Sequence, residues 1–213
     1  MRHVLFTDLG DVLIMADPGR AAAGLQKLLP ALSAGEICTM LGSEEGAKIR
    51  HRFDCGMMTM NQYQHAVETL LGGKMDSQAF RKAHVSFLTP NMPVIQLWKK
   101  LRAGDRIEKL IAVSNTDPVR AGHAIILLGN ANLRFDAIVA SYAVGARKPD
   151  PIMFRTALNV AKARPEECIM VDDKLSNVES AQALGIAGIH YLSGHPRAQE
   201  FLISDLEKFS IRA

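Results

Sequence analysis

Reactive polar residues stand at the ends of short apolar runs in this sequence. They are three carboxylates, a hydroxyl, an amide and a lysine: Asp8, Asp172, Asp173, Ser114, Asn115 and Lys148. Carboxylate oxygens are the hard ligands that Mg²⁺ prefers, and hydroxyl, amide and ammonium groups bind phosphate oxygens. Gathered at one edge of a fold, these side chains would form a site for a phosphate group and a divalent cation.

Five apolar, β-rich runs predict the strands that would gather them. These runs are His3–Asp8, Leu110–Ser114, Phe135–Ala140, Cys168–Asp172 and Gly188–Leu192. Helical patterns are predicted at Val94–Leu101, Pro118–Leu128, Asp150–Ala163, Asn177–Leu184 and Pro196–Phe209. Strands joined through helices run parallel with right-handed crossovers, so the prediction is an α/β fold with a doubly wound parallel sheet. Ligands of such sheets bind at the carboxyl ends of the strands.

Residues 16–88 break this alternation, because they show helical periodicity and no convincing strand. Ser33, Ser43, Thr59 and Asp76 are predicted N-caps, and Thr59 with Gln62 has the spacing of a capping box. We therefore expect four or five short helices here. The predicted division is an α/β core of residues 1–15 and 89–213 with a helical cap of residues 16–88.

Composition and charge exclude several classes of protein. Hydrophobic residues make up 48% of the 213 residues and the net charge is +3, which is unlike a disordered chain. The basic residues form no stripe for a nucleic acid, and no apolar run approaches the roughly 18–20 residues of a membrane span. Three scattered cysteines without a CxxC pair predict free thiols. We expect a cytoplasmic protein without a membrane or nucleic-acid partner, as a monomer or weak homodimer.

Four segments, taken in order, resemble the motifs of the haloacid dehalogenase-like hydrolase superfamily. They are Phe6–Leu13, Val113–Thr116, Arg147–Pro151 and Met170–Asp173, and the resemblance spans nearly the whole chain. Each motif is weak alone, since an aspartate after a strand is commonly a turn or a helix cap. Together they indicate the phosphatase-like branch of that family, with a Rossmann-like core and a helical cap inserted after the first motif.

The resemblance implies a role for each matched residue. Asp8 is the candidate nucleophile, which would form an aspartyl-phosphate and divide hydrolysis into two displacements. The implied ligands of Mg²⁺ are Asp8, the carbonyl of Gly10 and Asp173, with Asp172 beside them. Ser114 and the backbone N–H of Asn115 would bind phosphoryl oxygens, and Lys148 would neutralise their charge. Asn177 is expected to hold a metal-bound water or Asp173 in place.

One position departs from the family pattern. Phosphatases of this family usually carry an aspartate two residues after the nucleophile, which protonates the leaving group and later activates water. Here that position is Gly10, and Asp11 lies one place further along. Adjacent residues of an extended segment point in opposite directions, so Asp11 is not an assured substitute. Glycine also adopts a positive φ without cost, so a side chain at Gly10 is useful only where the backbone tolerates it.

These features favour a Mg²⁺-dependent phosphomonoester hydrolase acting on a small phosphorylated metabolite, sugar phosphates included. The segment His51–Gly56 of the cap is the hypothesised substrate contact, against the alternative of an exposed charged helix end. A 2-haloacid dehalogenase is the first alternative, since its chemistry needs no acid at Gly10. A non-catalytic module that binds a phosphorylated ligand through a decayed site is the second.

Overall fold

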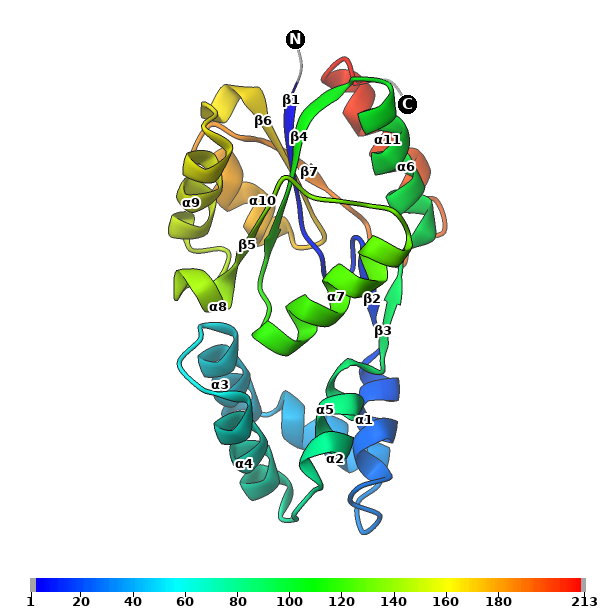
Figure 1. The fold of residues 1–213 in the computed structure, drawn as a ribbon, viewed down its shortest axis with the longest axis vertical. Helices are drawn as coiled ribbons and strands as arrows, with labels where there is room; N and C mark the ends of the chain where they lie inside the picture. Colours follow the sequence, from blue (N-terminus) through cyan, green and yellow to red (C-terminus); the bar gives the residue numbers. More distant parts are fainter. Residues whose placement is uncertain (1–2, 212–213) are drawn as a thin grey trace.

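A five-stranded parallel sheet forms the centre of the molecule (Figure 1). The computed structural model describes residues 3–211. The sheet has the order β5-β4-β1-β6-β7, made of β1 (His3–Thr7), β4 (Ile107–Ser114), β5 (Ala137–Ala140), β6 (Cys168–Asp172) and β7 (Ala187–His190). All four strand pairings are parallel. The predicted fold class and all five predicted strands are confirmed, with ends that differ by up to three residues.

Helices cover both faces of the sheet, as a doubly wound fold requires. They are α6 (Met92–Ala103), α7 (Pro118–Asn130), α8 (Ser141–Val144), α9 (Pro151–Ala161), α10 (Leu175–Gln182) and α11 (Ala198–Lys208), with a short 3₁₀ turn at Pro165–Glu167. Successive side chains of a strand point to opposite faces. Leu5 accordingly joins the core under α6 and α11, whereas Phe6 joins the core under α9 and α10.

Five helices lie between the first strand and α6, beyond the carboxyl end of the sheet (Figure 1). We call them the cap helices: α1 (Pro18–Gln26), α2 (Ala34–Gly42), α3 (Glu44–Asp54), α4 (Met60–Leu71) and α5 (Ser77–Val85). Ser33, Ser43, Thr59 and Asp76 each accept a backbone N–H at a helix start, so the four predicted N-caps are confirmed. The capping box of Thr59 and Gln62 is also present. The cap helices bury an apolar core of their own around Phe53.

A two-stranded ribbon joins the cap helices to the sheet. Strands β2 (Ile14–Ala16) and β3 (Leu88–Pro90) pair antiparallel, with Ile14 opposite Pro90 and Ala16 opposite Leu88. Sequence analysis missed both strands, because three residues are too few to show a period. The chain therefore leaves the core and returns to it at one place. None of the helices within residues 3–211 is both long and apolar enough to span a membrane.

Candidate active site

Three neighbouring strands deliver the predicted site residues to one edge of the sheet. Asp8 directly follows β1, Ser114 ends β4 on one side of it, and Asp172 ends β6 on the other side. The backbone N–H of Asp8 donates to the carbonyl of Val171 (2.9 Å), which continues the β1–β6 ladder up to the site. Parallel pairing in register thus places these residues side by side at the carboxyl ends of the strands.

Three carboxylates converge at this edge. Asp8, Asp172 and Asp173 each offer an oxygen, and these oxygens lie within 4.8 Å of one another. Burial, followed by the nearby charges of Asp8 and Asp172, raises the pKa of Asp173 to about 6. Clustered carboxylates of this kind repel one another unless a cation neutralises them. The donor set therefore fits a divalent cation with hard oxygen ligands.

Lys148 supplies one positive charge to the cluster. Its Nζ lies 2.6 Å from Oδ2 of Asp172 and 3.1 Å from Oδ2 of Asp8, and its side chain is fully buried. Burial opposes the charge of Lys148, but the two carboxylates outweigh it and hold the pKa of Lys148 above its ordinary value. Burial likewise raises the pKa of Asp8, and the charge of Lys148 opposes that shift. The lysine stays protonated and its position is fixed.

Both oxygens of Asp172 are occupied by protein donors. Oδ2 accepts from Lys148, while Oδ1 accepts from the amide of Asn177 (2.8 Å) and from the backbone N–H of Lys174 (2.9 Å). Asn177 was expected to hold a metal-bound water or Asp173; its amide, in the first turn of α10, binds Asp172 and not Asp173, and the role toward a metal-bound water stays a prediction. Asp172 therefore serves mainly to orient Lys148, because both of its carboxylate oxygens already accept hydrogen bonds from the protein.

The phosphate-binding candidates differ in their partners. The Ser114 hydroxyl lies at the end of β4 and has no hydrogen-bond partner within residues 3–211, so it is available to a ligand. The Asn115 side chain is already engaged, since it forms two hydrogen bonds with the backbone of Lys148. The amide of Asn115 therefore holds the segment that carries the lysine. Only the backbone N–H of Asn115 was predicted to bind phosphate, and this role stays a prediction.

The turn after Asp8 has its left-handed residue at Asp11. The positive φ of the turn falls on Asp11 (φ 53°), and Gly10 is outside the left-handed region. Aspartate tolerates this conformation better than most residues, and here Oδ1 of Asp11 accepts the backbone N–H of Ala16 five residues on (3.0 Å). No atom lies within 4 Å of the position that a Cβ on Gly10 would take. The glycine is thus required neither by its backbone nor by close packing.

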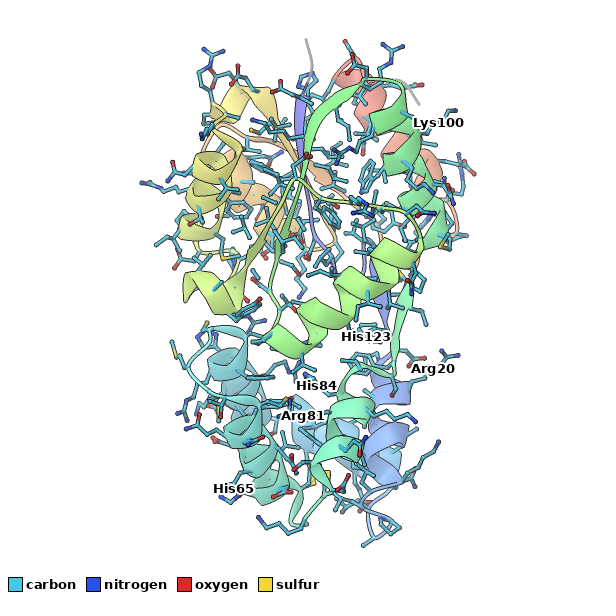
Figure 2. All side chains as sticks on the ribbon, in the orientation of Figure 1. Arg20, His65, Arg81, His84, Lys100 and His123 are labelled. Carbon is cyan, nitrogen blue, oxygen red and sulfur yellow. The ribbon has the colours of Figure 1, made fainter. Side chains whose placement is uncertain are left out.

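Sequence analysis missed a second buried polar cluster, which joins the cap helices to the core. The Arg120 guanidinium on α7 forms ion pairs with Asp54 at the end of α3 and with Asp117 at the start of α7. His84 on α5 binds the same Asp117 (2.9 Å), and Figure 2 shows His84 at the boundary between the cap helices and α7. Burial alone would raise the pKa of Asp117, but the hydrogen bond with His84 and the charge of Arg120 hold it well below its ordinary value.

The predicted substrate segment His51–Gly56 takes part in the same junction. Asp54 also pairs with Arg147 (3.4 Å), the residue before the site lysine, and its carbonyl accepts the hydroxyl of Ser141 (2.6 Å). A Cβ on Gly56 would lie 2.3 Å from the carbonyl of Tyr142, so only glycine permits this approach. The segment packs against the core, and no sequence pattern links it to partners 66 to 93 residues away.

Comparison with known families decides which fold family this site belongs to. Residues 58–185, more than half of the chain, match a family model described as haloacid dehalogenase-like hydrolase. The chain is a member of that hydrolase family. The family prediction made from the four motifs is confirmed.

Solved haloacid dehalogenase-like structures share the whole architecture. A HAD family enzyme of Bacteroides thetaiotaomicron superposes with a TM-score of 0.77 at 23% identity, covering 94% of this chain and 98% of that one. The same enzyme is known in complex with magnesium and inorganic phosphate. A predicted HAD-like family hydrolase of Porphyromonas gingivalis superposes with a TM-score of 0.79 at 20% identity and covers both chains fully. At these identities the likeness establishes the fold.

Curated proteins are similar to this chain over stretches of different length. The sesquiterpene phosphatase astK of Aspergillus oryzae is 46% identical over 56 residues, which is 26% of this chain and 29% of the relative. The chain spans less than a third of the length of the curated relatives it matches.

Proposed function

We propose that this hydrolase is a Mg²⁺-dependent phosphomonoesterase that acts through an aspartyl-phosphate on Asp8. The observation that carries the proposal is the convergence of Asp8, Asp172 and Asp173 around buried Lys148 at the ends of adjacent strands. Such a site combines a carboxylate nucleophile with a fixed cation and oxygen ligands. It suits displacement at phosphorus, where catalysis depends mainly on positioning and charge stabilisation.

The residues that would hold the cation are Asp8, Asp173 and the carbonyl of Gly10. Asp173 fits this role because burial, and after it the repulsion of neighbouring carboxylates, raises its pKa, and bound Mg²⁺ would relieve that repulsion. Asp172 is assigned to positioning Lys148. The cation would neutralise phosphate charge and align a phosphoryl oxygen with Asp8.

The remaining steps follow from the residues of the chain. An Asp8 carboxylate oxygen attacks phosphorus while the bond to the ester oxygen breaks, and the alcohol leaves with a proton from solvent or an acid. Water then attacks the aspartyl-phosphate, which releases inorganic phosphate and restores Asp8. The free hydroxyl of Ser114 and the backbone N–H of Asn115 would bind the phosphoryl oxygens. Gly10 offers no side chain for proton transfer, so leaving-group protonation is the weak step of this site.

Similar proteins support a phosphate ester as substrate. The Bacteroides enzyme binds magnesium and inorganic phosphate, and astK is a sesquiterpene phosphatase. We further propose that residues 16–88 act as a lid that excludes bulk water and selects the leaving group. The division into core and cap, the cytoplasmic location and the monomeric or weakly dimeric state are parts of the same proposal.

The same site also bears on the two alternative functions, a 2-haloacid dehalogenase and a decayed phosphate-binding module. A 2-haloacid dehalogenase would tolerate Gly10, but three clustered carboxylates would repel a haloacid and its chemistry needs no metal. A decayed phosphate-binding module would also tolerate Gly10. Against it, Asp8, Ser114, Lys148 and Asp173 are all present at the sheet edge.

One assay separates these three functions. Phosphate release from acetyl phosphate is measured with Mg²⁺, with Mn²⁺, with Ca²⁺ and with EDTA, and chloride release from 2-chloropropionate is measured in EDTA. We expect turnover with Mg²⁺ or Mn²⁺ and no turnover in EDTA. Ca²⁺ should inhibit, because its larger radius disturbs the in-line geometry. Chloride release in EDTA would favour the dehalogenase, and release of neither phosphate nor chloride would favour the decayed module.

A further inference from the structure

The cap helices enclose a cavity that the proposed chemistry does not use. Its volume is about 310 Å³, which falls within the range of about 300–1,000 Å³ typical of small-molecule sites. Most of its wall is aliphatic or aromatic, including Ala22, Leu25, Leu41, Val67, Phe80 and Phe87. All five cap helices contribute to it, together with α7 of the core. The site described above is polar, so this is a chemically different space.

The charged side chains and the histidine of the wall are engaged with other protein groups. His84 binds Asp117, Arg120 binds Asp117 and Asp54, and Arg50 donates to the carbonyl of Leu41 (2.8 Å). A sugar or another ligand rich in hydroxyl groups would leave those groups without hydrogen bonds in this cavity, at a cost of about 1–3 kcal/mol each. The chemistry of the wall therefore suits hydrocarbon.

Two residues of the cavity wall belong to, or bond with, the segments that carry the phosphate site. Arg120 lies in the first turn of α7, which begins four residues after Ser114. Ala16, also in the wall, donates its backbone N–H to Asp11 in the turn that follows Asp8. In an in-line displacement the leaving oxygen departs on the side opposite to the nucleophile. With Asp8 at the end of β1, that side faces the cap helices (Figure 1).

We propose that this cavity binds the hydrocarbon part of the leaving alcohol. The substrates are then phosphate monoesters of elongated apolar alcohols, and sugar phosphates are poor substrates. This inference rests on the proposed phosphatase function, which it narrows to a substrate class. Binding of hydrocarbon also offsets the missing acid at Gly10, because energy from a remote part of the substrate can stabilise the transition state.

The test uses n-alkylphosphonates, which carry a phosphate-like group but cannot be hydrolysed. Methyl-, butyl-, hexyl- and octylphosphonate are compared as inhibitors of Mg²⁺-dependent acetyl phosphate hydrolysis. The inhibition constant should fall about fourfold per added methylene, because each buried methylene contributes about 0.8 kcal/mol, until the cavity is filled. A sugar phosphate should inhibit no better than methylphosphonate. A flat series would overturn the inference while leaving the phosphatase proposal intact.

Cys38 provides a second readout that needs no turnover. It lines the cavity and is the exposed cysteine of the three, since Cys55 and Cys168 are buried. Octylphosphonate should slow the alkylation of Cys38 by iodoacetamide, measured by mass spectrometry, and methylphosphonate should not. Equal alkylation rates with both phosphonates would contradict occupancy of the cavity. Failure of acetyl phosphate hydrolysis would instead contradict the phosphatase proposal.

Substitutions in α2 complete the test. Cys38→Phe fills part of the cavity and should bring the inhibition constant of octylphosphonate to within a few-fold of that of methylphosphonate. Thr39→Phe is the matched control, because Thr39 is the adjacent exposed residue and is not among the residues that line the cavity. Melting temperatures establish that both variants are folded. An unchanged preference for octylphosphonate in folded Cys38→Phe would overturn the inference. If Cys38→Phe does not fold, the alkylphosphonate series in the unmodified protein decides the inference.

Discussion

The side-chain amide of Asn115 holds the backbone of Lys148 by two hydrogen bonds. Nδ2 donates to the Lys148 carbonyl (2.8 Å), and Oδ1 accepts the Lys148 N–H (2.7 Å). The residue after β4 thereby fixes the segment that delivers the ammonium group to Asp8 and Asp172. This contact joins the second and third sequence motifs, which lie 33 residues apart in the chain.

Asn115→Ala removes both of these hydrogen bonds and leaves the charge of Lys148 unchanged. We expect kcat to fall about 10–100-fold, the usual effect of losing a residue that orients a site group. Lys148→Met is the comparison and should lower kcat further, because it removes the charge itself. Measurement of kcat and KM separately, with circular dichroism of each variant, checks this. Equal kcat values for Asn115→Ala and the unmodified protein would show that Lys148 needs no such support.

Asp8→Asn tests the nucleophile. The amide keeps the shape of the carboxylate and an oxygen for the Leu9 N–H (2.7 Å), so the fold should persist. Turnover should fall below detection, because an amide oxygen does not form the acyl-phosphate. Phosphate release and melting temperature are the measurements. Wild-type rates in Asp8→Asn on any phosphomonoester would refute the assignment.

Gly10→Asp tests the missing acid, and the structure predicts that it folds. A Cβ at this position meets no atom within 4 Å, and the backbone is outside the left-handed region. Since general acid catalysis contributes about 10²–10⁴-fold, turnover of alkyl phosphates should rise more than turnover of p-nitrophenyl phosphate, whose phenolate leaves unaided.

Asp11→Asn is the partner experiment for the same proton. Asparagine keeps an oxygen for the Ala16 N–H and tolerates the φ of 53°. We expect its rates to stay within a few-fold of the unmodified protein. If Asp11→Asn abolishes activity while a folded Gly10→Asp gains nothing, Asp11 already serves as the acid.

Arg120→Met should weaken the interaction between the cap helices and α7 and so lower the free energy of unfolding. It leaves Asp117, which is fully buried, with His84 as its remaining side-chain partner, and Asp54 with Arg147. Removing one partner of a buried ion pair costs about 3–5 kcal/mol, so urea unfolding should show a large loss of stability. Arg20→Met is the matched control, because its pair with Asp17 is exposed. Similar losses for both variants would contradict a structural role for this cluster.

Glu68 on α4 should make the stability of the cap helices sensitive to acid. Its carboxylate accepts from Lys74, from the backbone of Met75 and from Gln64, and these contacts lower its pKa from 4.5 to about 2. A carboxyl whose pKa is lowered in the folded state stabilises the protein above pH 4.5 and loses that contribution as the pH falls toward 2. Glu68→Gln should therefore lower the melting temperature at pH 7, with a difference that narrows below pH 4.5. A melting-temperature difference that does not change with pH would contradict this linkage. Glu44→Gln is the control, because the side chain of Glu44 is exposed.

The strand ends and helix starts were predictable because their signals are local. A few residues of sequence are enough to show an apolar run that ends in Asp8. The same holds for a serine that directly precedes a helix, such as Ser33 before α2. The partner of Asn177 was not visible, because the direction of its amide depends on where α10 begins. Contacts such as Asp54 with Arg120 join positions 66 residues apart, and they follow from packing that no single segment encodes.

The pairing of β2 with β3 bears on how such a chain can diversify. Entry to the cap helices and return from them occur at directly opposed residues, Ile14 with Pro90 and Ala16 with Leu88. Everything between them can lengthen, shorten or be exchanged during evolution without shifting the strands that present Asp8, Ser114 and Asp172. In the proposed phosphatase, selection on the choice of alcohol and selection on the cleavage of its phosphate would act on separate stretches of the gene.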